Sequence, residues 1–340
     1  MTSANAKIKK RVLFVGKAGP LGEDILDALQ NIGMSCQFFD YNNSLFFRST
    51  LFRKILRRTR MLGTVKRIVK KRINQLLLNE TLRFKPDILL IWNGELITPK
   101  TIEIIRSRQI ITANWFLDLM THWDAIKKIA PLYDYFFTPD QRVNEELKNM
   151  GIKSYVIPFT YKVTWDDFPT HTRPYNVTFI GSYEPSIWKK REELLSAIAS
   201  FGLHIWGPSA WKKSAVKDCY RGTASGKEMI DIYSRSKIVI DIPWDHIIAD
   251  TVSIRPYEAT SAGACLFYYD IRPAIKKLFI SEKEYIPFKD VEELKCKLRN
   301  LLDNPTDLEH IARAGFLRFM REHTYESRLR KIFSIIDSSA

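Results

Sequence analysis

Short apolar runs, each followed by a turn and then an amphipathic segment, recur along the chain and restrict its fold more than any other feature. The first run, 11–16, ends in a glycine, and the pattern starts again at 176–181 with a second glycine-terminated run. A strand of a parallel sheet is buried on both faces and is therefore apolar throughout. We predict an α/β fold that builds a doubly wound parallel sheet twice. The predicted strands are 11–16, 35–40, 87–92, 110–115, 133–138, 154–157, 176–181, 204–206, 237–242 and 265–269.

Length supports a division into two domains. A chain of 340 residues exceeds the usual size of one domain. The polar, proline-containing stretch from Thr164 to Pro174 is predicted to be the linker. We therefore expect an N-terminal domain over 1–165 and a C-terminal domain over 175–320.

The composition indicates where in the cell the protein is found and whether it binds a metal or cofactor. Hydrophobic residues make up 45% of the chain, as in globular proteins, and no apolar run has the roughly 20 residues that span a bilayer. Residues 1–10 are too polar for a signal peptide. The four cysteines are scattered without metal-ligand or redox spacing, which indicates a reducing compartment. We expect a cytoplasmic protein with no bound metal and no cofactor.

The net charge of +15 comes mainly from one segment. Eleven lysines and arginines and no acidic residue lie between Arg48 and Arg72, and the other 42 of the 53 basic residues nearly balance the 38 acidic ones. Apolar residues recur at roughly helical spacing over 48–76, which predicts one basic amphipathic helix, or two that are broken near Gly63. Such a helix suits an anionic membrane surface or anionic acceptor, and would allow peripheral attachment to the inner face of the membrane. The alternative is a helix packed on its own domain. Nucleic acid is less favoured because no recognition motif accompanies the charge.

Three glycines follow the first predicted strand. Gly16, Gly19 and Gly22 have the spacing G-x-x-G-x-x-G, which lets backbone amides approach an anion but differs from the dinucleotide fingerprint G-x-G-x-x-G. Asp40 ends the next strand, where a dehydrogenase places its ribose-binding acid. An NAD-dependent oxidoreductase therefore stays open as an alternative. A tight turn, or an acceptor-side loop built on Gly16 and Gly19, is favoured over it.

A carboxylate and a histidine follow the strand 110–115. Asp118 lies just past the strand's carboxyl end, where open α/β sheets place their sites, and can act as a general base or orient a sugar hydroxyl. His122 is close behind it on the acceptor side. The alternatives are a helix N-cap for Asp118 and an ordinary surface histidine.

Two turns of the second half are candidate phosphate and base contacts. Gly181 and Ser182 end a strand ahead of a helix that carries Arg191, an arrangement that can cradle a pyrophosphate. Trp206 and Gly207 end the next strand and can form a wall for a base. In isolation each feature equally fits an ordinary turn.

Arg255 and Glu258 are the strongest candidates in the sequence for binding a nucleotide. Arg255 lies at a predicted helix start with Pro256 in the first turn, where a cation can hold phosphate. Glu258 lies one turn later on the same face, and a carboxylate accepts two hydroxyl hydrogen bonds, as a ribose diol offers. The alternative is an Arg–Glu ion pair that caps the helix.

These motifs together resemble the CgeB-like glycosyltransferases, a family with the GT-B fold. The matching segments are Phe179–Ser182 with Arg191, Tyr233–Asp241, Arg255–Gly263, and His323-Thr324-Tyr325 with Arg328. The likeness covers roughly 176–336, with a less specific match around Asp118. Asp241 stands where the family usually has asparagine.

The resemblance implies two Rossmann-like domains that face each other across a cleft, with a C-terminal helix, 321–340, that crosses back to the N-terminal domain. It implies that Glu258 binds ribose, that Arg255 and Arg191 approach the diphosphate above Gly181 and Ser182, and that Asp250 contacts the donor sugar. The implied reaction moves a hexosyl group from a nucleoside-diphosphate sugar, with UDP favoured, to a hydroxyl of a glycan or lipid-linked acceptor in cell-surface polysaccharide synthesis.

Catalysis in this interpretation falls to Arg255, for the leaving group, and to Asp118, as the base of an inverting reaction. A retaining reaction needs no such base, and both outcomes stay open. The sequence holds no Asp-x-Asp triplet, which agrees with a metal-independent enzyme. The remaining alternative is a non-catalytic protein that binds a membrane or an anionic polymer through the basic segment.

Overall fold

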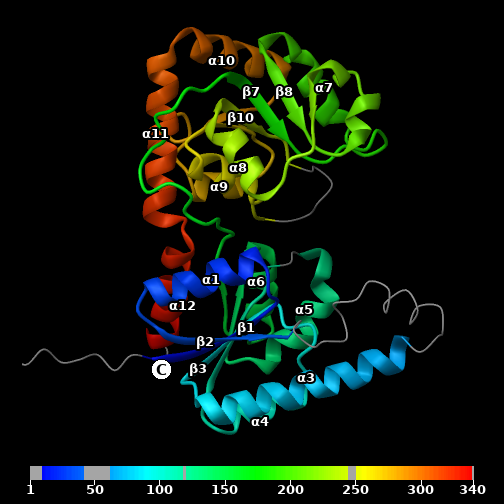
Figure 1. The fold of residues 1–340 in the computed structure, drawn as a ribbon, viewed down its shortest axis with the longest axis vertical. Helices are drawn as coiled ribbons and strands as arrows, with labels where there is room; N and C mark the ends of the chain where they lie inside the picture. The colour runs from blue at the N-terminus through cyan, green and yellow to red at the C-terminus, as the bar shows by residue number, and fades with distance from the viewer. Residues whose placement is uncertain (1–9, 42–61, 118–119, 244–249, 339–340) are drawn as a thin grey trace, which may run out of the picture. The chain divides into compact units, whose positions relative to one another are not determined.

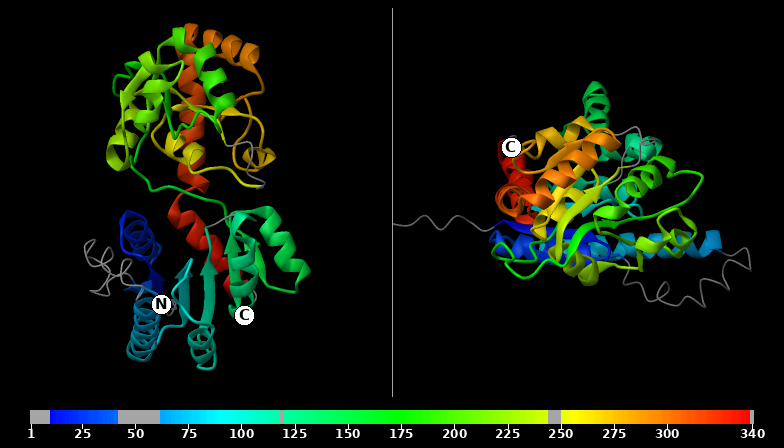
Figure 2. Two further views of the ribbon diagram at one scale, coloured as in Figure 1. Left: turned by 90° about the vertical axis from the view of Figure 1, so that its right-hand side faces the viewer. Right: turned by 90° about the horizontal axis from the view of Figure 1, so that it is seen from above.

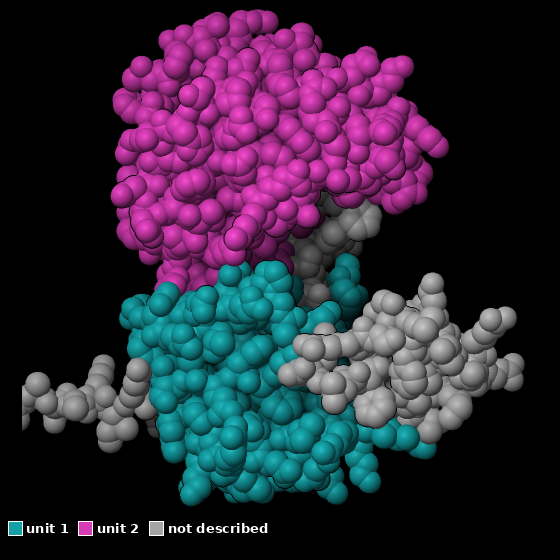
Figure 3. Space-filling model, viewed as in Figure 1, with its two compact units in different colours: residues 1–158, 328–340 teal, residues 159–327 magenta. Residues whose placement is uncertain are grey.

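The computed structural model describes residues 10–41, 62–117, 120–243 and 250–338, and it divides into two compact units. Unit 1 comprises Met1–Pro158 and Arg328–Ala340, and unit 2 comprises Phe159–Ser327 (Figure 3). Each unit holds a six-stranded sheet whose neighbouring strands all run parallel. The predicted α/β class with two doubly wound sheets is therefore confirmed.

Unit 1 has the strand order β2-β1-β3-β4-β5-β6. Chain order reverses beside β1, which pairs with both β2 and β3. The strands are β1 (Arg11–Gly16), β2 (Ser35–Asp40), β3 (Ile88–Trp92), β4 (Ile111–Trp115), β5 (Tyr135–Thr138) and β6 (Ser154–Val156). The helices are α1 (Pro20–Asn31), α3 (Leu62–Phe84), α4 (Pro99–Arg106), α5 (Trp123–Ile129), α6 (Gln141–Asn149) and the short η1 (Met120–His122) and η2 (Ala130–Leu132).

Helices cover both faces of this sheet (Figure 1). Side chains of β1 alternate between the faces, so that Leu13 and Val15 join the core formed with α3, α4, α5 and α6. Helix α1 lies on the other face together with the last helix, α12 (Tyr325–Ser338). The last helix is tied to unit 1 by an ion pair between Lys10 and Asp337 and by the Tyr135 hydroxyl, which donates to the carbonyl of Ile336 at 3.5 Å.

Unit 2 has the strand order β12-β11-β10-β7-β8-β9, so chain order reverses between β7 and β10. The strands are β7 (Tyr175–Ile180), β8 (Leu203–Trp206), β9 (Tyr220–Gly222), β10 (Ser236–Asp241), β11 (Cys265–Tyr269) and β12 (Ile286–Phe288). The α-helices are α7 (Lys189–Ala197), α8 (Gly226–Ser234), α9 (Arg255–Ser261), α10 (Val291–Asp303) and α11 (Pro305–Glu322). Four short helices are η3 (Ala199–Phe201), η4 (Ser209–Lys213), η5 (Lys217–Cys219) and η6 (Pro273–Lys277).

Two apolar cores enclose the sheet of unit 2. One joins α7, α10 and α11 to side chains such as Phe179, Ile240 and Phe267. The other joins α8 and α9 to Val239 and Leu266. Figure 2 shows α11 along one side of the sheet in both views. Because Val239 and Ile240 enter different cores, the end of β10 is fixed from both faces.

The predicted linker, 164–174, differs from the structure. The unit boundary falls earlier, after Pro158, and the segment packs on unit 2. Phe168 is buried in the unit 2 core, and the Arg173 guanidinium donates to the carbonyl of Gly263. The stretch has the polarity and prolines of a linker, but its one phenylalanine and one arginine attach it to the domain that follows.

The basic segment is only partly described, because 42–61 lie outside the described residues. Helix α3 begins at Leu62 and includes Gly63. Val69 and Ile73 are buried, as their helical spacing predicts, whereas Leu76, which the same spacing places with them, is 37% exposed and Leu77 is buried instead. No described helix is long and apolar enough to cross a membrane.

Candidate functional site

The carboxyl ends of β7 and β10 lie side by side where the strand order of unit 2 reverses. Val177 of β7 pairs with Ile238 of β10, and the two strands run on in parallel to Ile180 and Asp241. Open α/β sheets bind their ligands at this kind of position, beyond the carboxyl ends of the strands at a switch point. Four of the predicted site residues, Gly181, Ser182, Arg255 and Glu258, belong to the loop and the helix beside this point.

Arg255 joins the two strand ends. Its Nη1 forms an ion pair with the fully buried carboxylate of Asp241, and its Nε donates to the Ile180 carbonyl at 3.0 Å. The Ser253 hydroxyl donates to the second oxygen of Asp241 at 3.0 Å. Burial alone would lower the pKa of Arg255, but the neighbouring Asp241, Tyr233 and Glu258 outweigh it and raise that pKa above its ordinary value. Arg255 is therefore a permanent cation that is already shared with a carboxylate.

Gly181 leaves room for that guanidinium. A Cβ at this position would lie 3.2 Å from Arg255 Nη2 and 2.7 Å from the ring of Phe179. The Nη2 group thus lies beside the backbone of the turn that follows β7. An anion resting on this turn would meet the one guanidinium nitrogen that is committed neither to Asp241 nor to Ile180.

Glu258 lies in the first turn of α9 and is 8% exposed. Desolvation raises the pKa of its carboxyl to about 7, with Asp241 raising it further and Arg255 opposing the shift. A buried carboxyl with a pKa close to neutrality is a frequent mark of a functional site. It becomes a strong double acceptor when it is ionised.

Arg191 is predicted to approach a phosphate, but its guanidinium is used within the protein. Nη1 donates to the Ser182 carbonyl at 2.7 Å, and Nη2 donates to the Ile242 carbonyl at 2.6 Å. The guanidinium carbon also lies 3.5 Å from the centre of the Trp188 ring. Arg191 therefore links the turn that follows β7 to the turn that follows β10.

Trp206 was predicted to form one wall of a site for the nucleotide base, but its ring is not exposed to a ligand. Its side chain is buried and packs edge-on against Tyr175, with ring centroids 5.3 Å apart. Gly207 next to it is closely approached, since a Cβ there would lie 2.2 Å from the carbonyl oxygen of Gly181. The tryptophan that contacts this turn is Trp211, whose indole donates to that same oxygen at 2.9 Å.

Two further predicted residues are not among these four. Asp250 pairs with Lys277 at 3.4 Å and directly follows residues 244–249, which lie outside the described residues. Asp118 itself lies outside the described residues. Their roles in sugar binding and base catalysis stay predictions.

In unit 1, the glycine turn after β1 is held in place by Asp40, the last residue of β2. The amide of Ala18 donates to the Asp40 carboxylate at 2.9 Å, so the acid that a dehydrogenase would offer to ribose helps to hold the turn. Gly16 lies against the ring of Trp92, and Gly19 precedes α1. His122 is exposed at the end of η1.

A pair of asparagines at the carboxyl ends of β3 and β4 was not predicted from the sequence. The side-chain amide of the buried Asn114 donates to the Asn93 carbonyl at 3.1 Å, and the Leu117 amide donates to the Asn93 side chain at 2.9 Å. This pair fixes the chain immediately before Asp118. Two polar residues, each at the end of an apolar strand, were the available signal. Within the described ranges no three His, Cys, Asp or Glu side chains are grouped to hold a metal ion.

Comparison with known families and structures adds independent findings. Residues 190–334 match the protein family described as Glycosyl transferase-like. A sequence comparison with curated proteins gives no match.

Several solved structures share the fold. Sucrose-phosphate synthase from Thermosynechococcus elongatus aligns with a TM-score of 0.66 at 10% identity, over 98% of this chain and 100% of that one. HepE from Anabaena, in complex with UDP and glucose, aligns with a TM-score of 0.61 at 10% identity, over 97% and 100%. The lipopolysaccharide outer core galactosyltransferase WaaB aligns at 0.63 with 13% identity, over 97% and 100%. At these identities the likeness establishes the GT-B fold.

Proposed function

We propose that this chain, which carries the Glycosyl transferase-like pattern over 190–334 on a GT-B fold, is a glycosyltransferase that uses a nucleoside-diphosphate sugar. One observation carries the proposal. At the switch point of the unit 2 sheet, the Nη2 group of Arg255, the Gly181 turn and the buried carboxyl of Glu258 lie together. A nucleoside diphosphate requires a cation for its phosphates, a close backbone approach and an acceptor for its ribose diol. UDP is favoured, since HepE was solved with UDP and glucose.

The reaction breaks the bond between the sugar C1 and the β-phosphate oxygen and forms a bond from C1 to an acceptor hydroxyl oxygen. Negative charge develops on the departing diphosphate, where Arg255 Nη2 and the backbone amide of Ser182 would stabilise it. In an inverting reaction the acceptor proton passes to Asp118. Asp118→Asn should then lower kcat and leave UDP-glucose affinity unchanged, whereas equal kcat would remove Asp118 from the mechanism.

Donor binding tests the ribose assignment. Glu258→Ala should weaken UDP binding by about 1.5–3 kcal/mol, the range for hydrogen bonds to a charged group. Glu228→Ala, an exposed carboxylate on α8, is the matched control. Titration calorimetry with UDP, GDP, TDP and CMP measures the nucleotide affinity of both variants. Unchanged affinity in Glu258→Ala would contradict the assignment.

Activity that persists in EDTA checks the proposal of metal independence.

An NAD-dependent oxidoreductase makes the opposite prediction. It requires NAD to raise the melting temperature while nucleotide sugars leave it unchanged, because a ligand of the native state stabilises in proportion to its affinity. The bond from Ala18 to Asp40 weighs against it. One thermal-shift screen with NAD, UDP-glucose and UDP therefore separates the two functions.

The acceptor is proposed to lie on an anionic membrane surface, which α3 would contact. Arg67, Lys70, Lys71 and Arg72 form no ion pair within the described residues. Ile68 and Leu82 on the same helix are 60% and 53% exposed. Cations beside exposed apolar side chains suit a lipid interface, and each cation near it contributes about 1 kcal/mol.

Vesicle sedimentation tests the membrane contact. Replacing these four cations with glutamine should reduce binding to phosphatidylglycerol vesicles at least about tenfold. Replacing Lys212, Lys213, Lys217 and Lys227 of unit 2 with glutamine removes the same charge elsewhere and should change little. Equal losses in both variants would show that net charge alone determines binding.

A further inference from the structure

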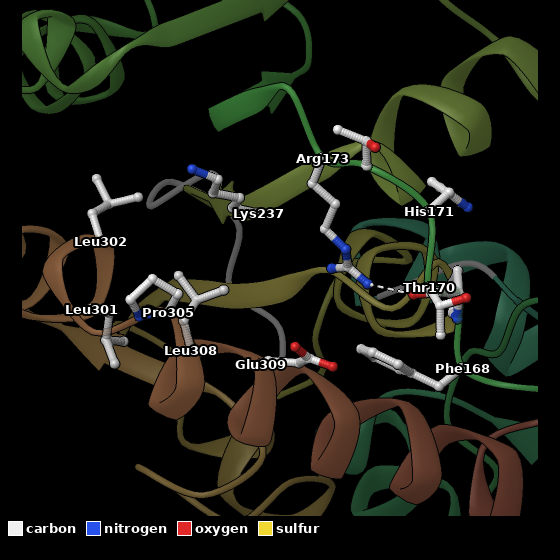
Figure 4. Close-up of a pocket in the computed structure, with 12 residues that line it drawn as sticks. Phe168, Thr170, His171, Arg173, Lys237, Leu301, Leu302, Pro305, Leu308 and Glu309 are labelled. Carbon is white, nitrogen blue, oxygen red and sulfur yellow. Dashed lines mark hydrogen bonds between the residues drawn. The ribbon is translucent and has the colours of Figure 1, made fainter.

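A cavity of about 460 Å³ opens in unit 2 at the edge of its sheet opposite the carboxyl ends of the strands (Figure 4). Its walls are the segment 168–173, the first part of β10, the end of α10 and the first turns of α11. Lys237, near the start of β10, lines this cavity, whereas Asp241 at the end of β10 holds Arg255. Four residues of strand span about 13 Å, so a ligand here would leave the carboxyl edge free.

One side of the cavity is apolar. Figure 4 shows Leu301, Leu302, Leu308 and Pro305 together on the side facing Arg173, with the ring of Phe168 opposite. The space between them is large enough for a short alkyl chain, and burial of such a chain contributes about 0.8 kcal/mol per methylene group.

The polar side carries an excess of positive charge. The Arg173 guanidinium extends into the middle of the cavity (Figure 4), and Lys237 donates to the Asn176 side chain at 2.8 Å, which leaves two of its three ammonium hydrogens for other acceptors. Arg313 lies over the Phe168 ring at 4.5 Å and pairs with Glu309, the one acidic residue of the lining, at 3.8 Å. Two cations of the lining, Arg173 and Lys237, therefore face one carboxylate, which already pairs with Arg313.

Arg173 is held in place by the protein and has capacity to spare. It donates to the carbonyls of Gly263, Ser236 and Pro169, the last at 3.2 Å, and its guanidinium lies 5.1 Å from the Phe168 ring centre. Burial lowers the pKa of Arg173, since the surroundings solvate its charge poorly, and the Glu309 carboxylate opposes this shift. The carbonyl dipoles supply no net negative charge, so an anion beside this group would gain more than in water.

We propose that this cavity binds a small anion that carries an alkyl chain, with the anionic head between Arg173 and Lys237 and the chain along the leucines of α10 and α11. The site is separate from the proposed nucleotide site and does not depend on it. Carboxylate and phosphate heads share the chemistry that these cations recognise.

Octanoate and octyl phosphate, each as a monomer, are suitable probes of the full chain by titration calorimetry. At least one should bind, while acetate, which lacks the chain, and n-octylamine, which reverses the charge, should bind at least about tenfold more weakly. Lys237→Met should weaken the bound probe about tenfold. Lys213→Met, which removes an exposed cation far from the cavity lining, should leave it unchanged.

Competition separates this site from the nucleotide site. The probe should bind equally in the presence of saturating UDP-glucose, and the Glu258→Ala variant should retain it. Failure of both probes to bind, equal binding of n-octylamine, unchanged affinity in a folded Lys237→Met variant, or displacement by UDP-glucose would each overturn the proposal. If the protein binds the probe but does not bind UDP, the proposed function is contradicted and the proposal for this cavity is not.

Discussion

At the scale of single residues, the ion pair between Arg255 and Asp241 determines how much positive charge the site can offer. Asp241 is fully buried and accepts from both Arg255 and Ser253. Breaking a buried pair by removing one partner's charge is costly, because the other charge stays desolvated. The same pair lowers the attraction of Arg255 for an incoming phosphate.

Asp241→Asn should therefore act in opposite directions on stability and on binding. The free energy of unfolding should fall by about 2 kcal/mol, since a neutral amide compensates the buried guanidinium incompletely. UDP should bind severalfold more tightly, because Arg255 regains net charge. Urea denaturation and calorimetry measure the two effects. Ser253→Ala, which removes a neutral donor only, should leave UDP affinity unchanged, and weaker UDP binding in Asp241→Asn would contradict this account.

Because the pKa of Glu258 is raised, its contribution to the free energy of unfolding should depend on pH with the opposite sign to that of most carboxylates. Desolvation raises its pKa from 4.5 to about 7, so the folded state binds a proton more tightly than the unfolded state. Stability should decline as the pH rises from about 4.5 to 7, by about 3 kcal/mol for a shift of this size. Glu258→Gln should be more stable than the parent at pH 8 and equal to it at pH 4. A parallel pH profile in both proteins would contradict the shift.

UDP-glucose affinity should follow the same titration. The carboxylate accepts two hydroxyl bonds only when it is ionised, so binding should tighten between pH 6 and 8 and the trend should vanish in Glu258→Gln.

The family resemblance predicted that Arg255 and Glu258 come together with Gly181, although they follow two different strands, β10 and β7. It did not predict that Arg191 faces two carbonyls or that Trp211 takes the place of Trp206, since such choices depend on contacts between distant segments.

At the scale of elements, the ends of β7 and β8 fit together only because Gly207 lacks a side chain. A Cβ there would press on the Gly181 carbonyl at 2.2 Å, and the backbone φ is 157°. A backbone oxygen within a sheet has little freedom to move away. Gly222, with a φ of 127°, has open space where its Cβ would lie.

Gly207→Ala should consequently be far more destabilising than Gly222→Ala. Both substitutions strain a left-handed φ, at about 1–2 kcal/mol, but only the first adds a clash with the backbone. We expect Gly207→Ala to lose at least about 2 kcal/mol more in chemical denaturation, and to lose UDP binding as the Gly181 turn shifts. Equal losses would show that strain, and not the close approach, requires the glycine.

Long elements were predictable to within a residue or two, and short ones were not. Strand β1 matches its apolar run, and β10 begins and ends one residue before the predicted 237–242. The three-residue edge strands β9 and β12 were missed, because a run of three residues, one with a central proline, has no periodicity to detect. For α3, packing left Leu76 exposed although spacing placed it with the buried face.

At the scale of the whole molecule, unit 1 depends on the end of the described chain. Helix α12 supplies four buried apolar side chains from beyond the unit boundary: Leu329, Ile332, Phe333 and Ile336. Removing them would uncover the part of one face of the unit 1 sheet that α1 does not cover, while leaving the chain of unit 2 whole. A restart of the strand pattern predicts two sheets, but it cannot show which sheet a distant helix covers, and only the family resemblance indicated a returning helix.

A chain that ends at Ser327 should therefore unfold in two steps. The loss of four buried side chains, each worth about 2–5 kcal/mol when truncated, exceeds the stability of an ordinary domain. Unit 1 should be unfolded or unfold at low urea, whereas the unit 2 transition should persist. Hydrogen exchange resolved by peptide measures this, and uniform protection across both units would contradict it.

The interruption of unit 1 by unit 2 has a consequence for biosynthesis. A ribosome delivers residues 10–158 first, then all of unit 2, and only afterwards the helix that completes the first sheet. Unit 2, which is continuous, has its full set of strands while the earlier sheet still has part of one apolar face uncovered. The nascent unit 1 therefore waits through the synthesis of another whole domain with apolar surface exposed, a condition under which incomplete chains are prone to aggregate.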